Sequence, residues 1–135
     1  MKNVLCAVDD TDTSKEAIKV ATSLANSNGA RLLVITVNPL LAGGRGGIAS
    51  YLWEDSQVQK IIDDAVAVAK PTVPAATAVV RARDVSRAIL GYAEDNSVDH
   101  IVVGTGGKGR LARSLIGSVS NDVVNRAHCA VTVAR

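Results

Sequence analysis

The chain has 135 residues, a formal net charge of +2, 47% hydrophobic residues and only 2% aromatic residues. This length and hydrophobic content predict a single globular domain, residues 1–135, with a core of aliphatic side chains. The mild charge and the scarcity of rings on which bases could stack exclude a typical nucleic-acid-binding protein.

The N-terminal segment MKNVLCAVDD is an apolar run closed by two carboxylates. It is too short for the core of a signal peptide, and no run approaches the ~18 apolar residues of a membrane span. Cys6 and Cys129 lie in apolar segments without a CxxC motif, which predicts buried thiols rather than a disulfide or metal site. We therefore expect a cytoplasmic protein without a membrane partner.

The chain alternates short apolar runs with longer segments in which apolar residues recur every three or four positions. The first pattern predicts buried strands and the second amphipathic helices. A capping-box spacing at Thr13-Ser-Lys-Glu16 begins the first helix, and Asn28-Gly29 ends it. In chain order we expect a strand at 4–8, a helix at 13–28, a strand at 31–37, a loop at 38–53, a helix carrying 58–69, a strand at 76–81, a helix from 84, a strand at 100–103, a glycine loop, a helix carrying 119–127, and a strand at 130–134.

Five strands that alternate with four helices predict an α/β domain, a three-layer sandwich around a five-stranded parallel sheet. Ligands bind such sheets beyond the carboxyl ends of the strands, where the strand order reverses. Asp9-Asp10-Thr11 follow the first strand and the glycine loop begins at Gly104, after the fourth. The simplest order that brings these two ends together is 3-2-1-4-5, with a crevice between strands one and four.

The glycine-rich segment GTGGKGRLARSLIGS, residues 104–118, has three interpretations. Glycine at this density weakens regular structure and lets backbone N–H groups approach phosphate oxygens. A P-loop, G-x-x-x-x-G-K-[ST], is excluded because Gly107-Lys108 is followed by Gly109. The dinucleotide fingerprint G-x-G-x-x-G is formally matched from Gly104 through Gly106 to Gly109, but the next strand does not end in the acidic residue that would hold the ribose.

The third interpretation uses Gly104, Gly107, Gly117 and Ser118, which match G-x2-G-x9-G-S. With this motif the chain resembles the universal stress protein family, specifically its nucleotide-binding branch, in which the spacing is the ATP-binding signature. The resemblance covers essentially the whole chain. VLCAVDDTDTSKEAI resembles the family's first strand and helix, RDVSRAIL the start of its third helix, VDHIVVGTGGKG its fourth strand and loop, and IGSVSNDVVNRAHCAVTVAR its C-terminal block.

The resemblance implies an ATP site in which N–H groups from the turns at 104–107 and 117–118 converge on the phosphates. The hydroxyls of Ser118 and Ser120 would donate to phosphate oxygens, and the positive end of the helix after Gly117 would face them. Asp9 would contact the ribose or help to hold Mg²⁺. The residues implied for the whole site are Ala7, Val8, Asp9, Val37, Val103, Gly104, Gly106, Gly107, Gly117, Ser118, Val119 and Ser120.

The chain departs from the family's usual pattern at three places. Val8-Asp9-Asp10-Thr11 stands where members commonly read Val-Asp-Gly-Ser, and Arg83 and Val85 replace a glycine and a proline before the third helix. Gly106 occupies a position that is often basic, a loss that Lys108, Arg110 or Arg113 would offset. The sequence therefore indicates the fold more directly than it indicates ATP as the preferred adenine nucleotide.

The leading functional hypothesis is an ATP-binding stress or signalling protein whose conformation or partners respond to the nucleotide. No nucleophile–base pair is evident in the crevice, so the sequence does not support efficient catalysis, and slow hydrolysis assisted by a metal near Asp9 stays open. A structural dimer module without a ligand is one alternative. The family pairs its last strand across a two-fold axis, which implies a homodimer through the strand at 130–134.

A phospho-accepting receiver domain is the other alternative. Receiver domains also have five parallel strands and an acidic pair after the first strand, which Asp9-Asp10 resembles. Asp84 and Thr105 would supply the acidic residue after strand three and the hydroxyl after strand four. The lysine and last helix that follow strand five in receiver domains are missing from this sequence.

Two aromatic residues, Tyr51 and Trp53, lie in the long loop after the second strand. Each is suited to covering a ligand, packing on the surface or meeting a partner, and the sequence does not choose among these roles.

Overall fold

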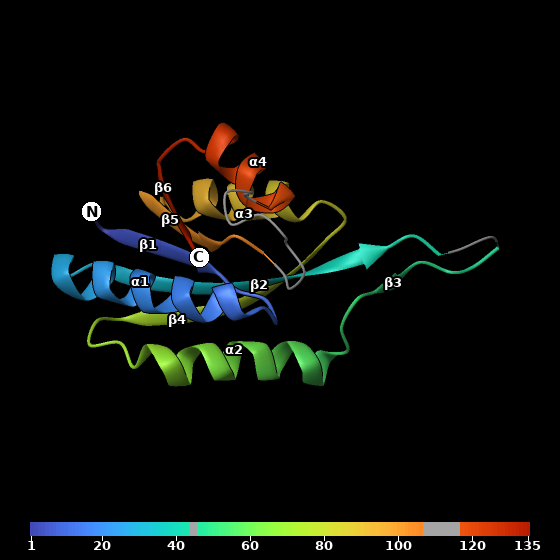
Figure 1. Ribbon diagram of the computed structural model, residues 1–135, viewed down its shortest axis with the longest axis horizontal. Coiled ribbons are helices and arrows are strands. Elements are labelled where there is room, and N and C mark those ends of the chain that lie inside the picture. Colours follow the sequence, from blue (N-terminus) through green and yellow to red (C-terminus); the bar gives the residue numbers. More distant parts are fainter. Residues whose placement is uncertain (44–45, 107–116) are drawn as a thin grey trace.

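The computed structural model describes residues 1–43, 46–106 and 117–135 (Figure 1). The elements in chain order are β1 (Asn3–Ala7), α1 (Asp12–Asn28), β2 (Arg31–Leu41), β3 (Ser50–Tyr51), α2 (Asp55–Ala69), β4 (Ala75–Ala82), α3 (Val85–Asp95), β5 (His100–Gly104), α4 (Ser118–Arg126) and β6 (Ala130–Ala134).

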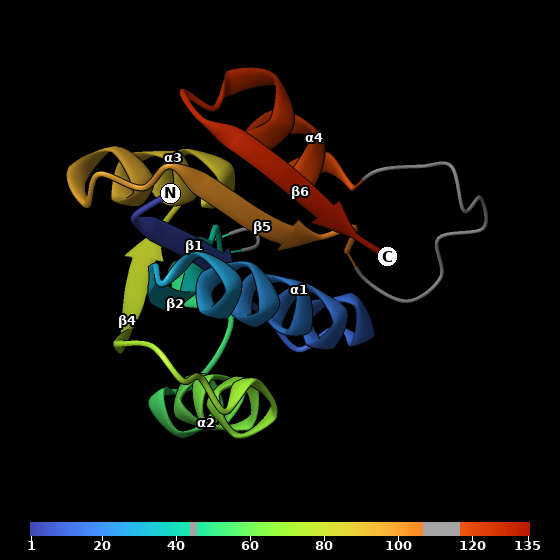
Figure 2. The same ribbon diagram turned by 90° about the vertical axis from the view of Figure 1, so that its left-hand side faces the viewer.

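Five parallel strands form the centre of the molecule in the spatial order β4-β2-β1-β5-β6. This is the predicted order 3-2-1-4-5, and it is confirmed. Helices α1 and α2 cover one face of the sheet and α3 and α4 cover the other, as the two views in Figures 1 and 2 show. The result is the predicted three-layer sandwich, with β1 at its centre.

The core divides into two clusters because successive side chains of a strand point to opposite faces. Val4 and Cys6 of β1 pack under α1 with Ile18, whereas Leu5 packs on the other face with Ile89 of α3. Residues on the central strands are almost fully buried, which matches their near-continuous apolar sequence. The strands with the most continuous apolar sequences are therefore the ones at the centre of the sheet.

Strand β2 is longer than predicted, and the loop that follows it contains a sixth strand. The predicted strand stopped at residue 37, but β2 continues to Leu41, and β3 pairs with this extension antiparallel, Leu40 opposite Tyr51. The sheet is thus mostly parallel rather than wholly parallel. The chain after β3 is held against β2 by hydrogen bonds between the Asn38 side chain and the Trp53 backbone. Apolar periodicity in the sequence does not reveal such a contact. Part of the GGRGG tip, residues 44–45, lies outside the described residues.

The capping box predicted at Thr13–Glu16 is wrong. Helix α1 begins at Asp12, with Thr11 as the N-cap residue and no capping bond from its side chain. The reason lies at the end of β1, where the Asp9 carboxylate accepts a hydrogen bond from Thr11 N at 2.9 Å. This bond stabilises a turn at residues 9–11, so the helix begins before the predicted capping residue.

The predicted start of the third helix at Asp84 is confirmed. Asp84 is the N-cap residue of α3, and its Oδ1 accepts a hydrogen bond from Arg87 N at 3.1 Å. This bond, together with one from Ser86 Oγ, holds the pKa of the Asp84 carboxyl below its usual value.

Within the part of the chain that the structure describes, no helix is both long and apolar enough to span a membrane.

Candidate functional site

The carboxyl ends of the adjacent strands β1 and β5 open onto a cavity of about 300 Å³, called here the β1–β5 cavity. Its position agrees with the crevice predicted between strands one and four. Gly107 lies outside the described residues, as do Lys108, Arg110 and Arg113. Every other residue predicted for the nucleotide site lines this cavity: Ala7, Val8, Asp9, Val37, Val103, Gly104, Gly106, Gly117, Ser118, Val119 and Ser120.

Asp9, at the end of β1, is anchored to the first turn of α1. Its Oδ1 accepts hydrogen bonds from Thr11 N at 2.9 Å, from Ser14 Oγ at 2.8 Å and from the Thr11 hydroxyl. Ser14 Oγ in turn accepts a hydrogen bond from Asp9 N at 2.9 Å. Among the described residues none donates to Oδ2, so this is the carboxylate oxygen that a ligand would meet.

A metal site built from protein side chains is not found at Asp9. The described residues contain no group of three or more His, Cys, Asp or Glu side chains that could hold a metal ion. Mg²⁺ bound with a nucleotide commonly uses only one or two carboxylates and takes its other ligands from phosphates and water. Asp9 Oδ2 therefore has the chemistry of a ligand for a cation that arrives with a phosphate.

The start of the glycine loop is held against the first turn of α1 by Thr13. Thr13 Oγ1 accepts a hydrogen bond from Gly106 N and donates one to Gly106 O, both at 3.2 Å. A Cβ on Gly104 would lie 2.5 Å from Thr13 Oγ1 and 2.9 Å from the Thr13 carbonyl carbon. Gly106 has φ +112°, a conformation that L side chains rarely adopt.

These contacts give structural reasons for glycine at positions 104 and 106, whereas the family motif associates the glycine loop with phosphate binding. Gly104 is required because Thr13 approaches it closely, and Gly106 replaces a basic residue where the backbone has a positive φ. The Gly106 N–H is bonded to Thr13 Oγ1, so this amide of the turn is not free for a phosphate. Gly107, whose N–H was expected to point at one, lies outside the described residues. The sequence analysis assigned Thr13 to a helix cap and did not place it at the site; the signal for that place was the hydroxyl-rich run Thr11–Ser14.

The beginning of α4 has backbone donors that no helical hydrogen bond uses, but Gly117 is not one that remains available. Gly117 N donates to Thr105 O at 2.9 Å, and the buried Ser120 hydroxyl donates to Gly117 O at 3.0 Å. The expected phosphate contacts from the Gly117 amide and the Ser120 hydroxyl are therefore corrected. The first helical hydrogen bond runs from Asn121 N to Gly117 O, which leaves the N–H groups of residues 118–120 without helical partners at the positive end of the helix dipole.

An apolar wall closes the side of the cavity next to β2. It includes Val37, Pro39 and Ile89, together with Trp53 from the segment that follows β3. The sequence left several roles open for Trp53, and its place in the cavity wall favours contact with a ligand. Tyr51 does not line the cavity, and the Arg81 guanidinium lies 5.3 Å from its ring centroid.

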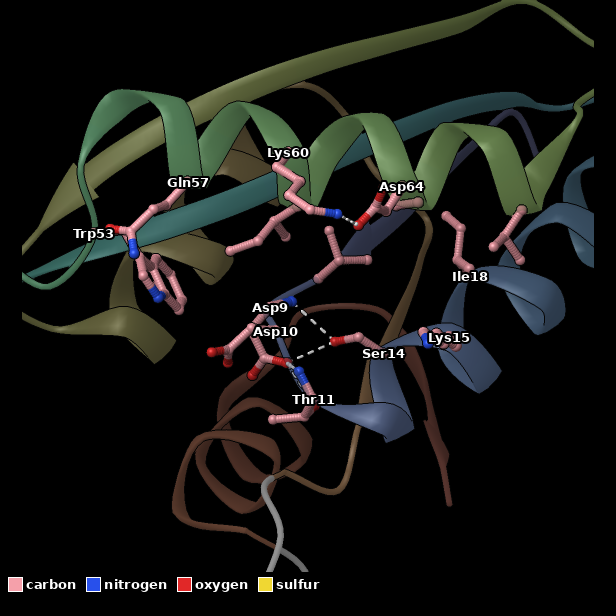
Figure 3. Close-up of a pocket in the computed structure, with 14 residues that line it drawn as sticks. Asp9, Asp10, Thr11, Ser14, Lys15, Ile18, Trp53, Gln57, Lys60 and Asp64 are labelled. Carbon is pink, nitrogen blue, oxygen red and sulfur yellow. Dashed lines mark hydrogen bonds and ion pairs between the residues drawn. The ribbon is translucent and has the colours of Figure 1, made fainter.

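A second cavity, of about 370 Å³, lies beside the first between α1 and α2, and Figure 3 shows its lining. Val8, Asp9 and Trp53 border both cavities. On the α2 side, Lys60 Nζ lies 2.8 Å from Asp64 Oδ2, and this ion pair raises the pKa of Lys60. The lining mixes cations, carboxylates and apolar side chains, and therefore favours no one charge of ligand.

The sheet order argues against the receiver alternative. Receiver-type sheets have the order 2-1-3-4-5, in which the third strand lies beside the first. Here β4 pairs with β2, whereas β1 pairs with β2 and β5. Asp84 accordingly lies beyond β2, where its carboxylate caps α3.

Comparison with known proteins relates this chain to a known family. The model of the universal stress protein family matches residues 1–135. The Thermus aquaticus universal stress protein in the QAH/OAS sulfhydrylase 3′ region is 32% identical, over 99% of this chain and 98% of that protein. Universal stress protein MJ0531 of Methanocaldococcus jannaschii is 29% identical, over 99% of this chain and 82% of that protein.

Solved structures of the same family show the same fold. A universal stress protein from Archaeoglobus fulgidus has a TM-score of 0.76 at 20% identity, covering 100% of this chain and 94% of that one. A universal stress protein in complex with cAMP has a TM-score of 0.75 at 22% identity, covering 99% and 96%. An Archaeoglobus fulgidus universal stress protein in complex with dAMP has a TM-score of 0.74 at 20% identity, covering 100% and 98%. The chain belongs to the universal stress protein family.

Proposed function

We propose that this protein binds ATP in the β1–β5 cavity and acts in the cytoplasm as a nucleotide-dependent signalling or stress-response module. The observation that carries the proposal is the convergence of three features on one cavity: the Asp9 carboxylate, an apolar wall and the first turn of α4. The solved family members in complex with cAMP and with dAMP support an adenine nucleotide as the ligand.

In this proposal each part of the nucleotide meets a different part of the cavity. The base lies against the apolar wall that includes Val37 and Val103, and the ribose lies near Asp9 Oδ2, which also faces any Mg²⁺ carried by the phosphates. The phosphates accept hydrogen bonds from the N–H groups of residues 118–120 and from the Ser118 hydroxyl. Hydrogen bonds to charged groups contribute about 1.5–3 kcal/mol each, so several together supply affinity in the micromolar range.

Isothermal titration calorimetry with ATP, ADP and AMP tests the proposal, with native mass spectrometry of the purified protein to detect nucleotide that co-purifies. The diagnostic variant is Ser118→Asp. Ser118 is exposed and lines the cavity at the first position of α4, where a carboxylate favours the helix but repels phosphate. We expect ATP affinity to fall at least about tenfold.

Asn121→Asp is the matched control. Asn121 is also exposed, lies in the same helix and does not line the cavity, so the variant adds the same charge away from the phosphates. We expect a much smaller loss of affinity. Equal losses in the two variants would remove α4 from the site, and a wild-type protein without nucleotide affinity would favour the structural dimer module.

We also propose a homodimer that forms through β6. This strand pairs only with β5 among the described residues, so its outer edge keeps unpaired backbone groups of the kind that another chain can extend. Size-exclusion chromatography with light scattering should show a dimer. A monomer at high protein concentration would contradict this part of the proposal.

A further inference from the structure

Trp53 is held in place by the buried side chain of Asn38, which bonds to no other residue in the part of the chain that the structure describes. The Asn38 side chain, on a residue that is 1% exposed, donates from Nδ2 to Trp53 O at 2.8 Å and accepts at Oδ1 from Trp53 N at 3.0 Å. Leu52 N adds a hydrogen bond to Pro39 O at 2.9 Å. A buried amide is costly unless it is hydrogen-bonded, and here both of its ends bond to one backbone position. The clamp fixes the Trp53 backbone at the carboxyl end of β2.

The Trp53 side chain then extends toward the end of β1. Trp53 is half-buried and lines both the β1–β5 cavity and the neighbouring α1–α2 cavity. Figure 3 shows its indole ring pointing into the space that faces Asp9 and Asp10, from the opposite side. Among the described residues that line the β1–β5 cavity, Trp53 is the only aromatic one.

We infer that Trp53 is the specificity-determining residue for the base, with its indole ring as the surface on which a purine stacks. The inference rests on the proposed function. The rest of the apolar wall is aliphatic, including Val37 and Val103, and such side chains contact a purine and a pyrimidine alike. An indole discriminates because a larger base overlaps it more fully, and stacking on an aromatic side chain changes affinity by about tenfold or more.

The chain contains a single tryptophan, so its intrinsic fluorescence reports on this position alone. We expect the fluorescence of the wild-type protein to change with added ATP until the site is saturated. The ATP concentration at half of this change should agree with the dissociation constant from calorimetry. CTP should bind about tenfold more weakly than ATP. The variant Trp53→Leu should lose about tenfold in ATP affinity and most of the preference for ATP over CTP, whereas Trp53→Phe, which keeps a ring, should retain both to within about threefold.

Tyr51→Leu is the control, because Tyr51 belongs to the same hairpin and does not line the cavity. Its ATP affinity and its preference for ATP over CTP should equal those of the wild type. Urea unfolding of each variant separates loss of the fold from loss of stacking. If Trp53→Leu does not fold, the wild-type fluorescence response and the Trp53→Phe titration decide the question.

The outcomes separate the two proposals. If the wild-type protein binds no nucleotide by calorimetry, the proposed function fails and the inference falls with it. If the wild type binds ATP but its fluorescence does not change, or folded Trp53→Leu keeps the ATP affinity and the preference over CTP, the inference is overturned while the proposed function stands.

Discussion

The side-chain hydroxyl of Thr13 lies 3.2 Å from both the amide nitrogen and the carbonyl oxygen of Gly106, a residue 93 positions later in the chain. One hydroxyl thus ties the first turn of α1 to the start of the glycine loop. Thr13 Oγ1 also lies 3.2 Å from Thr11 Oγ1, and the Thr11 hydroxyl donates to the Asp9 carboxylate. Because each hydroxyl carries a single proton, Thr11 holds the end of β1 and Thr13 holds the glycine loop, both at the start of α1.

Thr13→Val should lower the free energy of unfolding by about 1–2 kcal/mol, because it removes both hydrogen bonds to Gly106 and leaves the Gly106 N–H without its partner. Valine has nearly the shape of threonine, so the packing is preserved. Urea unfolding measures the effect. Thr13→Ser keeps the hydroxyl and should retain most of the stability; equal losses in the two variants would show that the methyl group, and not the hydroxyl, is what matters.

Gly104→Ala should destabilise the protein by about 1–3 kcal/mol, because the new Cβ would meet Thr13 Oγ1 at 2.5 Å and the Thr13 carbonyl carbon at 2.9 Å. Gly91→Ala is the matched control. Gly91 lies within α3, and a Cβ there meets nothing within 4 Å, so alanine should stabilise the helix by about 0.5–1 kcal/mol. Thermal unfolding of both variants gives the comparison, and a neutral Gly104→Ala would contradict the close approach of α1.

The two cysteines should react at different rates with a thiol reagent. Both are free thiols; burial raises the pKa of Cys6, and burial together with the Asp99 carboxylate raises the pKa of Cys129. A raised pKa leaves less thiolate at neutral pH, so both should react more slowly than an exposed cysteine. Cys129, which is half-buried, should be labelled in the native protein, and the fully buried Cys6 only after unfolding. Alkylation followed by mass spectrometry identifies the sites, and rapid native labelling of Cys6 would be the contrary result.

Asp84 should make stability depend on pH in the acidic range. Its carboxyl pKa is lowered in the folded protein by hydrogen bonds from Arg87 N and Ser86 Oγ, so the unfolded chain takes up the proton first as the pH falls. The stabilisation is complete above the ordinary Asp pKa of about 3.9 and is lost as the pH falls through the lower pKa of the folded state.

Asp84→Asn isolates this effect, because asparagine is also a good N-cap residue but does not titrate. The stability advantage of the wild type over the variant should be larger at pH 7 than at about pH 3. Urea unfolding at both pH values measures it. A pH-independent difference would mean that the Asp84 charge is not coupled to folding.

Apolar periodicity predicted the alternation of strands and helices and the strand order, and the family resemblance supplied most of the residues that line the β1–β5 cavity, but not Thr13 or the place of Trp53. Apolar periodicity shows which side chains face the core, and parallel strands bring their carboxyl ends to one edge, so Asp9 and Gly104 were expected to lie close together. Asp84 was recognisable as the start of α3 because capping is a local interaction between residues three positions apart.

The tertiary structure alone decided which backbone groups remain available to a ligand. Gly106 N is bonded to Thr13 and Gly117 N to Thr105 O, although the turns at 104–107 and 117–118 had been expected to offer their amides to phosphate. The same holds for Trp53, whose position depends on the side chain of Asn38, 15 residues earlier. A pattern in the sequence specifies local geometry and burial, but hydrogen bonds between distant segments are chosen only when the packed elements bring donor and acceptor together.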